Sequence, residues 1–389
     1  MDPALTKGLK HSPSTRNQYH HEDDKIEKNK VGISVIIPNF NGEKVLRFSL
    51  TSLANQTFPK EMYEIIIVDN ASSDNSLKIL EELVQRYQNC SIKVIRLKKN
   101  LGYGRAINIG ALHARFDLIL VSNNDIIFHP KYLENLYKVY SYARKKDEKV
   151  AAAQGLHMYY PDVLCVYNAG GLLSILTGHY RFYGKCLTSE DFSKVVRWAQ
   201  EGKIGFSYIA FPNGAGALID RKVFLRLGGY YRLYFSGIEE IDLGILLHML
   251  GYRVIFIPSA ILYHKEGYTL GGRSTILVPH KLYLILAGIY ICMISLYGPS
   301  LLIKSLVTYL LPEILILIRS FFKREKVLVW AVMKSLQLNI RMTKVLKLRR
   351  SKVMRIINIQ LNEIISYLKY KDKYLSYPKL FASFIIRYL

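Results

Sequence analysis

Three short apolar runs near the start of the chain each stop abruptly at a group of polar residues. The runs cover residues 33–37, 64–68 and 119–121, and the polar groups after them begin at Pro38, Asp69 and Ser122. Segments with apolar residues at three- and four-residue spacing, 43–55 and 75–88, follow the first two runs, as in sheets whose parallel strands alternate with helices. Ligands of such sheets bind at the carboxyl ends of the strands. The pattern predicts an α/β domain with a ligand site at one sheet edge, where Asp125 is the most informative carboxylate.

A second group of acids lies at the start of a helix predicted in the middle of the chain. Glu239, Glu240 and Asp242 begin this helix, which ends at Gly251, and residues 253–257 predict the strand that follows. Negative charge near a helix N-terminus is stabilising by ~0.3–1 kcal/mol. That effect explains one acid well and three within four residues less well. The group is therefore a candidate functional site.

The charge of the chain is concentrated near its end. The 389 residues carry a net charge of +24, and from residue 323 onward 16 Lys and Arg stand against 3 Asp and Glu. This balance favours an acidic partner for the C-terminal part, either anionic lipid or nucleic acid. Residues 1–30 are polar and charged, which predicts a disordered leader rather than a signal peptide. The four cysteines are widely spaced and predict neither a zinc site nor a disulfide framework.

An uncharged apolar stretch precedes this basic region. Residues 282–303 contain no charge over 22 positions, and a Gly-Pro pair at 298 and 299 interrupts them. As helices, residues 282–297 and 300–318 would measure about 24 and 28 Å, slightly short of a ~30 Å hydrocarbon core. Basic residues on both sides favour a hairpin or re-entrant pair with both ends on the cytoplasmic side. The alternative is the buried helical core of a soluble domain or dimer. Residues 327–348, with Lys334, Arg341, Lys344 and Lys347 among apolar residues, predict an amphipathic helix on a membrane surface.

A series of motifs, taken together, resembles a known family. The motifs cover residues 34–42, 67–74, 100–110, 123–125, 213–217, 228–230 and 239–243, and His264 follows them. In this order they resemble family 2 glycosyltransferases, which have the GT-A fold, and the rhamnosyltransferase-like branch in particular. The resemblance extends from about Val31 to Gly272. It implies a Rossmann-like mixed sheet flanked by helices.

The resemblance also implies an activity and a donor site. The activity is transfer of a sugar from a nucleotide diphosphate donor to an acceptor hydroxyl, with inversion at the anomeric carbon. Asp69 is one of the residues that the resemblance assigns to the donor, but its position after a strand fits an Asx-turn that caps the next helix equally well. Asp125, together with His264, would bind a divalent cation, Mn²⁺ or Mg²⁺, which holds the diphosphate. The donor contacts that the resemblance assigns are Pro38, Asn39, Asn41, Asp69, Arg105 and Asn124.

The acids of the second group receive the catalytic roles. Glu240 matches the general base that removes the acceptor proton. Glu239 would hydrogen-bond the acceptor, and Asp242 would support the loop, although each remains a candidate for the base. The sequence departs from the family pattern at Asn123, where the first metal-binding acid is expected, and at Leu246, where relatives often carry an arginine.

Together these observations predict three parts: a leader at residues 1–30, a GT-A domain at 31–275 and a hydrophobic, basic helical membrane-association region at 276–389. We expect a membrane-associated inverting glycosyltransferase, transferring a hexosyl or rhamnosyl group on the cytoplasmic face of the cell membrane to a lipid-linked or membrane-presented glycan. The alternatives are a polyprenyl-phosphate sugar transferase and a catalytically inactive homologue that binds sugar nucleotides. Nucleic acid is not expected as a partner, because the basic residues alternate with aliphatic rather than stacking aromatic residues.

Overall fold

The computed structural model describes most of the chain from Val31 onward. The described residues are 31–161, 165–173, 180–182, 205–235, 237–265, 279–296 and 326–356, with a few single positions between 302 and 323. The leader expected over residues 1–30 lies outside them.

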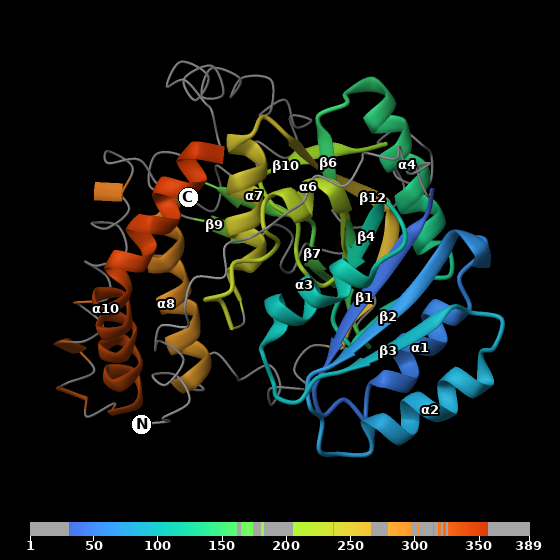
Figure 1. Cartoon of the computed structure of the whole chain (residues 1–389), viewed down its shortest axis with the longest axis horizontal. Helices are drawn as coiled ribbons and strands as arrows, with labels where there is room; N and C mark the ends of the chain where they lie inside the picture. The colour runs from blue at the N-terminus through green and yellow to red at the C-terminus, as the bar shows by residue number, and fades with distance from the viewer. Residues whose placement is uncertain are drawn as a thin grey trace, which may run out of the picture. The chain divides into compact units, whose positions relative to one another are not determined.

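One large mixed sheet forms the centre of the fold (Figure 1). Its strands lie in the order β10 (Ser207–Ile209), β12 (Arg253–His264), β6 (Val150–Tyr159), β11 (Ala217–Asp220), β4 (Leu118–Val121), β1 (Ile33–Asn39), β2 (Tyr63–Asp69) and β3 (Ile92–Arg96). Strands β4, β1, β2 and β3 are parallel, as the alternation of strands and helices predicts. β11 runs antiparallel to both β4 and β6 and makes the sheet mixed.

Short strands extend this framework. β5 (Ile126–Phe128) pairs with β12, and β7 (Val166–Asn168) pairs with β6. β8 (Gly171–Leu173) and β9 (Tyr180–Phe182) form a separate two-stranded sheet. A short 3₁₀ helix, η3 (Lys60–Met62), leads into β2.

Helices cover both faces of the large sheet. On one face lie α1 (Leu46–Ala54), α2 (Ser76–Arg86) and α4 (Tyr132–Lys146); on the other lie α3 (Tyr103–His113), α6 (Arg221–Arg226) and α7 (Glu239–Met249). Along β1, Val35 and Ile37 join the first core, whereas Ile36 joins the second, because successive strand residues point to opposite faces. A strand buried on both faces has an almost continuous apolar sequence, which is why these runs were visible in the sequence.

The strand expected at residues 253–257 is longer than its pattern indicates. β12 continues to His264, with a shift in its pairing to β6 between Ile257 and Ile261. Pro258 lies at this irregularity, where a missing N–H is tolerated. The extension pairs His264 with Ile126 of β5 and so brings it beside the end of β4.

Two C-terminal helices, α8 (Pro279–Leu296) and α10 (Lys326–Ile356), lie side by side next to α7 (Figure 1). Tyr290 and Met293 of α8 share a core with Ile241 of α7 and Leu346 of α10. None of the helices that the structure describes is long and apolar enough to span a membrane. α8, the described part of the expected membrane hairpin, packs against α7 and α10. Most of residues 300–318 lies outside the described residues.

We expect the contact between α3 and β1 to tolerate no side chain at Gly110. A Cβ there would lie 2.3 Å from Cγ2 of the fully buried Ile36. Overpacking of this kind costs about 1–3 kcal/mol, so Gly110→Val should lower the thermal unfolding midpoint. Leu112→Val, at an exposed position of the same helix, is the control and should leave the midpoint nearly unchanged. Equal midpoints for the two variants would contradict the close packing.

Candidate functional site

Buried amides and a carboxylate meet where β1, β2 and β4 end. Asn39 Nδ2 donates to Asp69 Oδ1 at 3.0 Å, and Asn124 Nδ2 donates to Asn39 Oδ1 at 2.8 Å. Asp69 also accepts hydrogen bonds from the Ser72 backbone N–H at 3.1 Å and from the Ser72 hydroxyl at 2.6 Å. Asp69 therefore holds the loop after β2 through a residue three positions on, not two as in an Asx-turn, and it does not cap α2, which begins at Ser76 without a side-chain cap bond. The same carboxylate belongs to the strand-end cluster.

The loop after β1 folds tightly over this cluster. A Cβ at Gly42 would lie 2.1 Å from Asn39 Oδ1 and 2.4 Å from Asn124 Nδ2, so only glycine fits. Asn41 is exposed, has a φ of 51°, and accepts a 2.8 Å hydrogen bond from the Ser73 N–H. Pro38 is buried within β1 opposite Val68, and its side chain carries no polar atom. Of the expected donor contacts, Asn39, Asn41, Asp69 and Asn124 thus come together.

Asp125 and His264 form a buried pair directly beyond this cluster. Asp125 Oδ1 lies 3.3 Å from His264 Nε2, yet neither Asp125 Oδ1 nor His264 Nδ1 forms a hydrogen bond. The ring of Tyr167 packs edge-on against the His264 ring at 4.6 Å between centroids. An oxygen and a nitrogen facing each other at this distance suit one cation between them. The described residues contain no group of three or more His, Cys, Asp and Glu that could hold a metal ion.

The start of α3 connects the strand ends to the second acid group. Gly102 precedes α3 with a φ of 85°, and a Cβ at Gly104 would lie 3.3 Å from Glu239 Cγ. The Tyr103 hydroxyl donates to the Gly214 carbonyl at 2.6 Å. Burial raises the pKa of Tyr103 well above its ordinary value, and the nearby charges of Glu240, Glu239 and Asp125 raise it further. Arg105 is half-buried, and its Nε donates to the Arg232 carbonyl at 3.0 Å.

The two glutamates at the start of α7 occupy poorly solvated positions. Glu239 is buried, and neither carboxylate oxygen has a hydrogen-bond partner of ordinary geometry. Burial, reinforced by Glu240, raises the pKa of Glu239 to about 8, although nearby backbone N–H groups oppose part of the effect. Glu240 is half-buried, and burial raises its pKa to about 7. An acid with a pKa near the working pH is suited to accept a proton.

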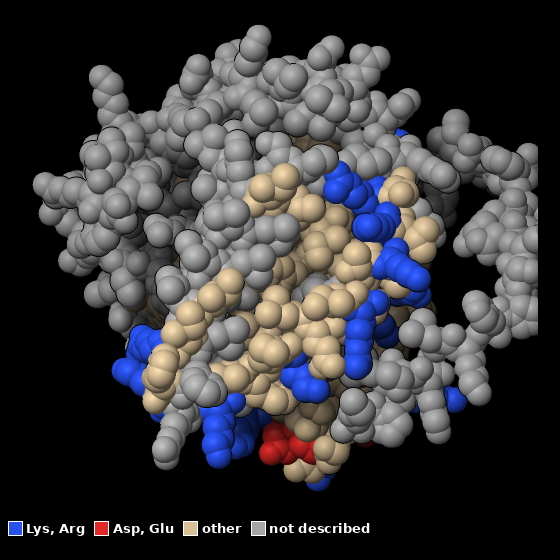
Figure 2. Space-filling view, turned by 90° about the vertical axis from the view of Figure 1, so that its left-hand side faces the viewer, with Lys and Arg blue, Asp and Glu red and all other residues tan. Residues whose placement is uncertain are grey.

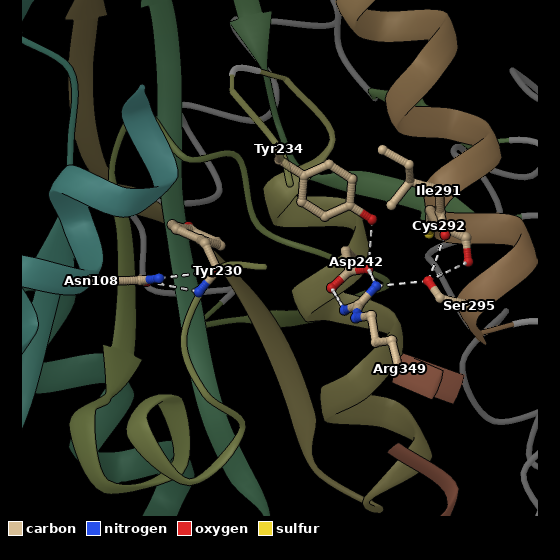
Figure 3. A network of polar contacts seen from close by, with 8 residues as sticks. All are labelled: Asn108, Tyr230, Tyr234, Asp242, Ile291, Cys292, Ser295 and Arg349. Atoms are coloured by element: carbon tan, nitrogen blue, oxygen red, sulfur yellow. Dashed lines mark hydrogen bonds and ion pairs between the residues drawn. The ribbon is translucent and has the colours of Figure 1, made fainter. Parts of the chain in front are cut away.

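Asp242 is placed differently from its two neighbours. It is buried and forms a two-pronged ion pair with Arg349 of α10, with distances of 2.7 and 2.6 Å (Figure 3). The Tyr234 hydroxyl donates to Asp242 Oδ1 at 2.7 Å. Its carboxylate is thus already occupied by Arg349 and Tyr234. Leu246, where relatives often carry an arginine, lies in the core that α7 shares with α8 and α10.

Comparison with known proteins assigns this arrangement to a family. Residues 34–155 match the model of glycosyl transferase family 2. Residues 34–155 thus belong to a family 2 glycosyltransferase domain. The chain is 30% identical over 240 residues to the probable glycosyltransferase YdaM of Bacillus subtilis, covering 61% of this chain and 51% of that protein. It is 40% identical over 93 residues to a poly(ribitol-phosphate) beta-glucosyltransferase of Bacillus spizizenii, covering 24% and 14%.

The chain spans about half the length of the first of these relatives and a smaller share of the second. The crystal structure of GalNAc-T7 with UDP, GalNAc and Mn²⁺ is similar with a TM-score of 0.52 at 18% identity, over 69% of this chain and 49% of that one. This likeness supports the GT-A fold. The comparisons do not single out the rhamnosyltransferase-like branch.

Two residues of the candidate site were not identified from the sequence. Tyr103 lies inside a recognised motif, between Gly102 and Gly104, and its position at the start of a helix after a strand was the available signal. Arg349 lies 107 residues from its partner in a segment rich in basic residues, where nothing local distinguishes one arginine from another. The roles of the predicted site residues remain predictions.

The raised pKa of Glu239 predicts a specific pH dependence of stability. A carboxyl group that holds its proton more tightly when folded stabilises the fold fully below its unfolded pKa and loses that contribution as pH rises through the folded value. Glu239→Gln should therefore raise the thermal midpoint relative to wild type at pH 8–9, but not near pH 4.5. The control Glu61→Gln removes an exposed charge and should show no such trend. A pH-independent difference for Glu239→Gln would contradict its burial as an acid.

Proposed function

We propose that this protein is an inverting glycosyltransferase that moves a sugar from a nucleotide diphosphate donor to an acceptor hydroxyl. The observation that carries the proposal is the position of the start of α3 between the strand ends and the acids of α7: the Asn70 amide, next to Asp69, donates to the Gly102 carbonyl at 3.2 Å, and a Cβ at Gly104 would lie 3.3 Å from Glu239 Cγ. Burial raises the pKa of Tyr103, which stands between these two glycines, and the charges of Glu240, Glu239 and Asp125 raise it further. This arrangement supports a base on one side of the site and a diphosphate-holding group on the other. The family of the domain supports the same reaction class.

The donor would be held at the strand ends. Asn39, Asp69 and Asn124 offer amide and carboxylate groups for the base or ribose of a nucleotide. Asp125 and His264 fit a divalent cation, Mn²⁺ or Mg²⁺, because Asp125 Oδ1 lies 3.3 Å from His264 Nε2 and forms no hydrogen bond. Such a cation would neutralise the charge appearing on the leaving nucleotide.

Glu240 is the side chain best suited to act as base. Its carboxylate, with a pKa raised to about 7 by burial, would accept the proton of the attacking hydroxyl. Glu239 would hydrogen-bond the acceptor, because both its carboxylate oxygens are available. A single direct attack from the base side inverts the anomeric centre. We propose a hexosyl or rhamnosyl group as the sugar.

We further propose that the acceptor is a lipid-linked or membrane-presented glycan and that α10 holds the protein at the cytoplasmic face of the membrane. One face of α10 exposes the apolar side chains of Trp330, Met333, Ile340 and Leu348. Its exposed basic residues include Lys326, Arg341, Lys344 and Lys347, and the helix contains no acidic residue. Figure 2, the view onto this side, shows Lys and Arg around uncharged surface with Asp and Glu confined to a small area. Apolar side chains mixed with basic ones suit the surface of an anionic bilayer.

A crossed experiment tests the two halves of the proposed site. Nucleotide diphosphate sugars with Mn²⁺ should raise the thermal midpoint of the wild-type protein, because ligands that bind the folded state stabilise it. Asp125→Ala should lose the cation-dependent part of this shift. Glu240→Gln should keep the shift but reduce transfer about 10²-fold or more, since it keeps the size and loses the basicity. Unchanged transfer by Asp125→Ala, or by the wild type in EDTA, would contradict the metal role. Normal transfer by Glu240→Gln would show that the general base is a neighbouring acid and not Glu240.

The membrane surface is tested with vesicles. The full chain should co-sediment with vesicles containing phosphatidylglycerol, less strongly with neutral phosphatidylcholine, and less strongly as salt increases. Lys344→Glu with Lys347→Glu should weaken binding by about tenfold or more, at about 1 kcal/mol per basic residue. The control Lys98→Glu with Lys99→Glu makes the same charge change after β3 and should bind normally. Equal binding to both vesicle types, or equal loss in both variants, would overturn the proposal.

A further inference from the structure

A buried polar network joins the catalytic helix α7 to both C-terminal helices (Figure 3). Arg349 of α10 donates to both oxygens of Asp242 and, at 2.7 Å, to the Ser295 hydroxyl of α8. That hydroxyl in turn donates to the Ile291 carbonyl within α8. The guanidinium also lies 3.8 Å from the centre of the Tyr231 ring. One arginine thus contacts three separate parts of the chain.

The geometry of the pair suits a fixed attachment. A guanidinium binds a carboxylate through two parallel hydrogen bonds, which fixes orientation as well as distance. Arg349 and Asp242 are both at least nine-tenths buried, so water competes little for these bonds. Asp242 lies in the first turn of α7, and this same turn contains Glu239 and Glu240.

A second contact holds the same turn from the C-terminal side. Ile238, the residue before α7, has a φ of 146°, which is a strained conformation for a β-branched side chain. Such a conformation persists only when the surrounding packing enforces it. The side chain of Ile238 packs directly against the backbone of Gly288 in α8. The approach is so close that a Cβ at Gly288 would lie only 2.8 Å from Ile238 Cγ1. The entry into α7 is therefore shaped by α8, and its first turn is tied to α10.

The electrostatics of the turn require a positive partner. Glu239, Glu240 and Asp242 place three acids within four residues, and Asp242 is among the charges that disfavour ionisation of Glu239. The buried cation of Arg349 offsets this negative charge. Without it, the first turn would have to move or take up protons.

We propose that Arg349 is a positioning residue that fixes the first turn of α7, so that helix α10 completes the catalytic side of the glycosyltransferase domain. This inference rests on the proposed function for its effect on transfer, but its effect on the turn stands independently of it. Arg349 acts through Asp242 on Glu239 and Glu240 and does not itself touch the substrates. The C-terminal helices thus form part of the site as well as an attachment surface.

Arg349→Gln tests the proposal in the full chain. Its kcat for transfer should fall about 10- to 100-fold, because small misplacement of a catalytic group is costly, while the dissociation constant for the nucleotide diphosphate with Mn²⁺ stays near that of wild type. Arg349→Lys keeps the charge but not the two-pronged geometry and should recover part of the loss. Hydrogen exchange of residues 237–243 should become faster in Arg349→Gln, because their attachment is lost.

Two controls separate positioning from general destabilisation. Val332→Ala removes buried side-chain volume from the same helix, about 25 Å along it from Arg349, and should lower the thermal midpoint without changing kcat per folded molecule. Arg86→Gln makes the same substitution at an exposed site at the end of α2 and should change neither. An Arg349→Gln variant with normal kcat and normal exchange at 237–243, or a kcat loss matched by Val332→Ala, would overturn the inference. A different result would refute the proposed function but not the positioning role. In that case the wild-type protein transfers no sugar, yet hydrogen exchange of residues 237–243 is still faster in Arg349→Gln than in wild type.

Discussion

Burial of α7 on two sides is the constraint on which this site depends. Leu243 and Leu247 pack toward the large sheet, whereas Ile241 and Ile245 pack toward α8 and α10. A helix that is apolar all round must be covered all round. Its first turn, which carries the acids, therefore begins inside the protein, and this burial raises the pKa of Glu239 and Glu240. The same enclosure makes a buried positive partner for Asp242 necessary.

Much of the fold and part of the site could be predicted from the sequence because their signals are local. Strands β1, β2 and β4 are buried on both faces, so their apolar runs end sharply at the residues that form the site. The parallel pairing of these strands then places Asn39, Asp69 and Asn124 together at one edge. The helices between the strands indicate their parallel direction, whereas the order and register of the strands had to come from the structure.

The remainder depends on contacts between distant parts of the chain. Pro258 interrupts the apolar pattern of β12, so the sequence pattern predicts a strand that ends before the segment with His264, whereas β12 continues to His264. The antiparallel strand β11 is four residues long, too short for its direction to be read from periodicity. No sequence pattern near Arg349 or Asp242 indicates that they form an ion pair. Which distant residues pair depends on how the chain packs in three dimensions and not on their spacing along it. Apolar residues in α8 resembled a membrane segment for a related reason: a helix buried between two others has the composition of a lipid-facing one.

The two faces of α10 perform different tasks, and the helix connects them rigidly. Its inner face carries Arg349 and Leu346, which are buried against α7 and α8, and its outer face exposes Lys344 and Lys347. Removing one partner of a buried ion pair costs about 3–5 kcal/mol, far more than an exposed basic residue contributes to the fold. The Asp125–His264 pair is held by β5 and β12. The Asp125–His264 pair and the first turn of α7 are thus supported by different elements, and Arg349 joins α10 to the first turn of α7.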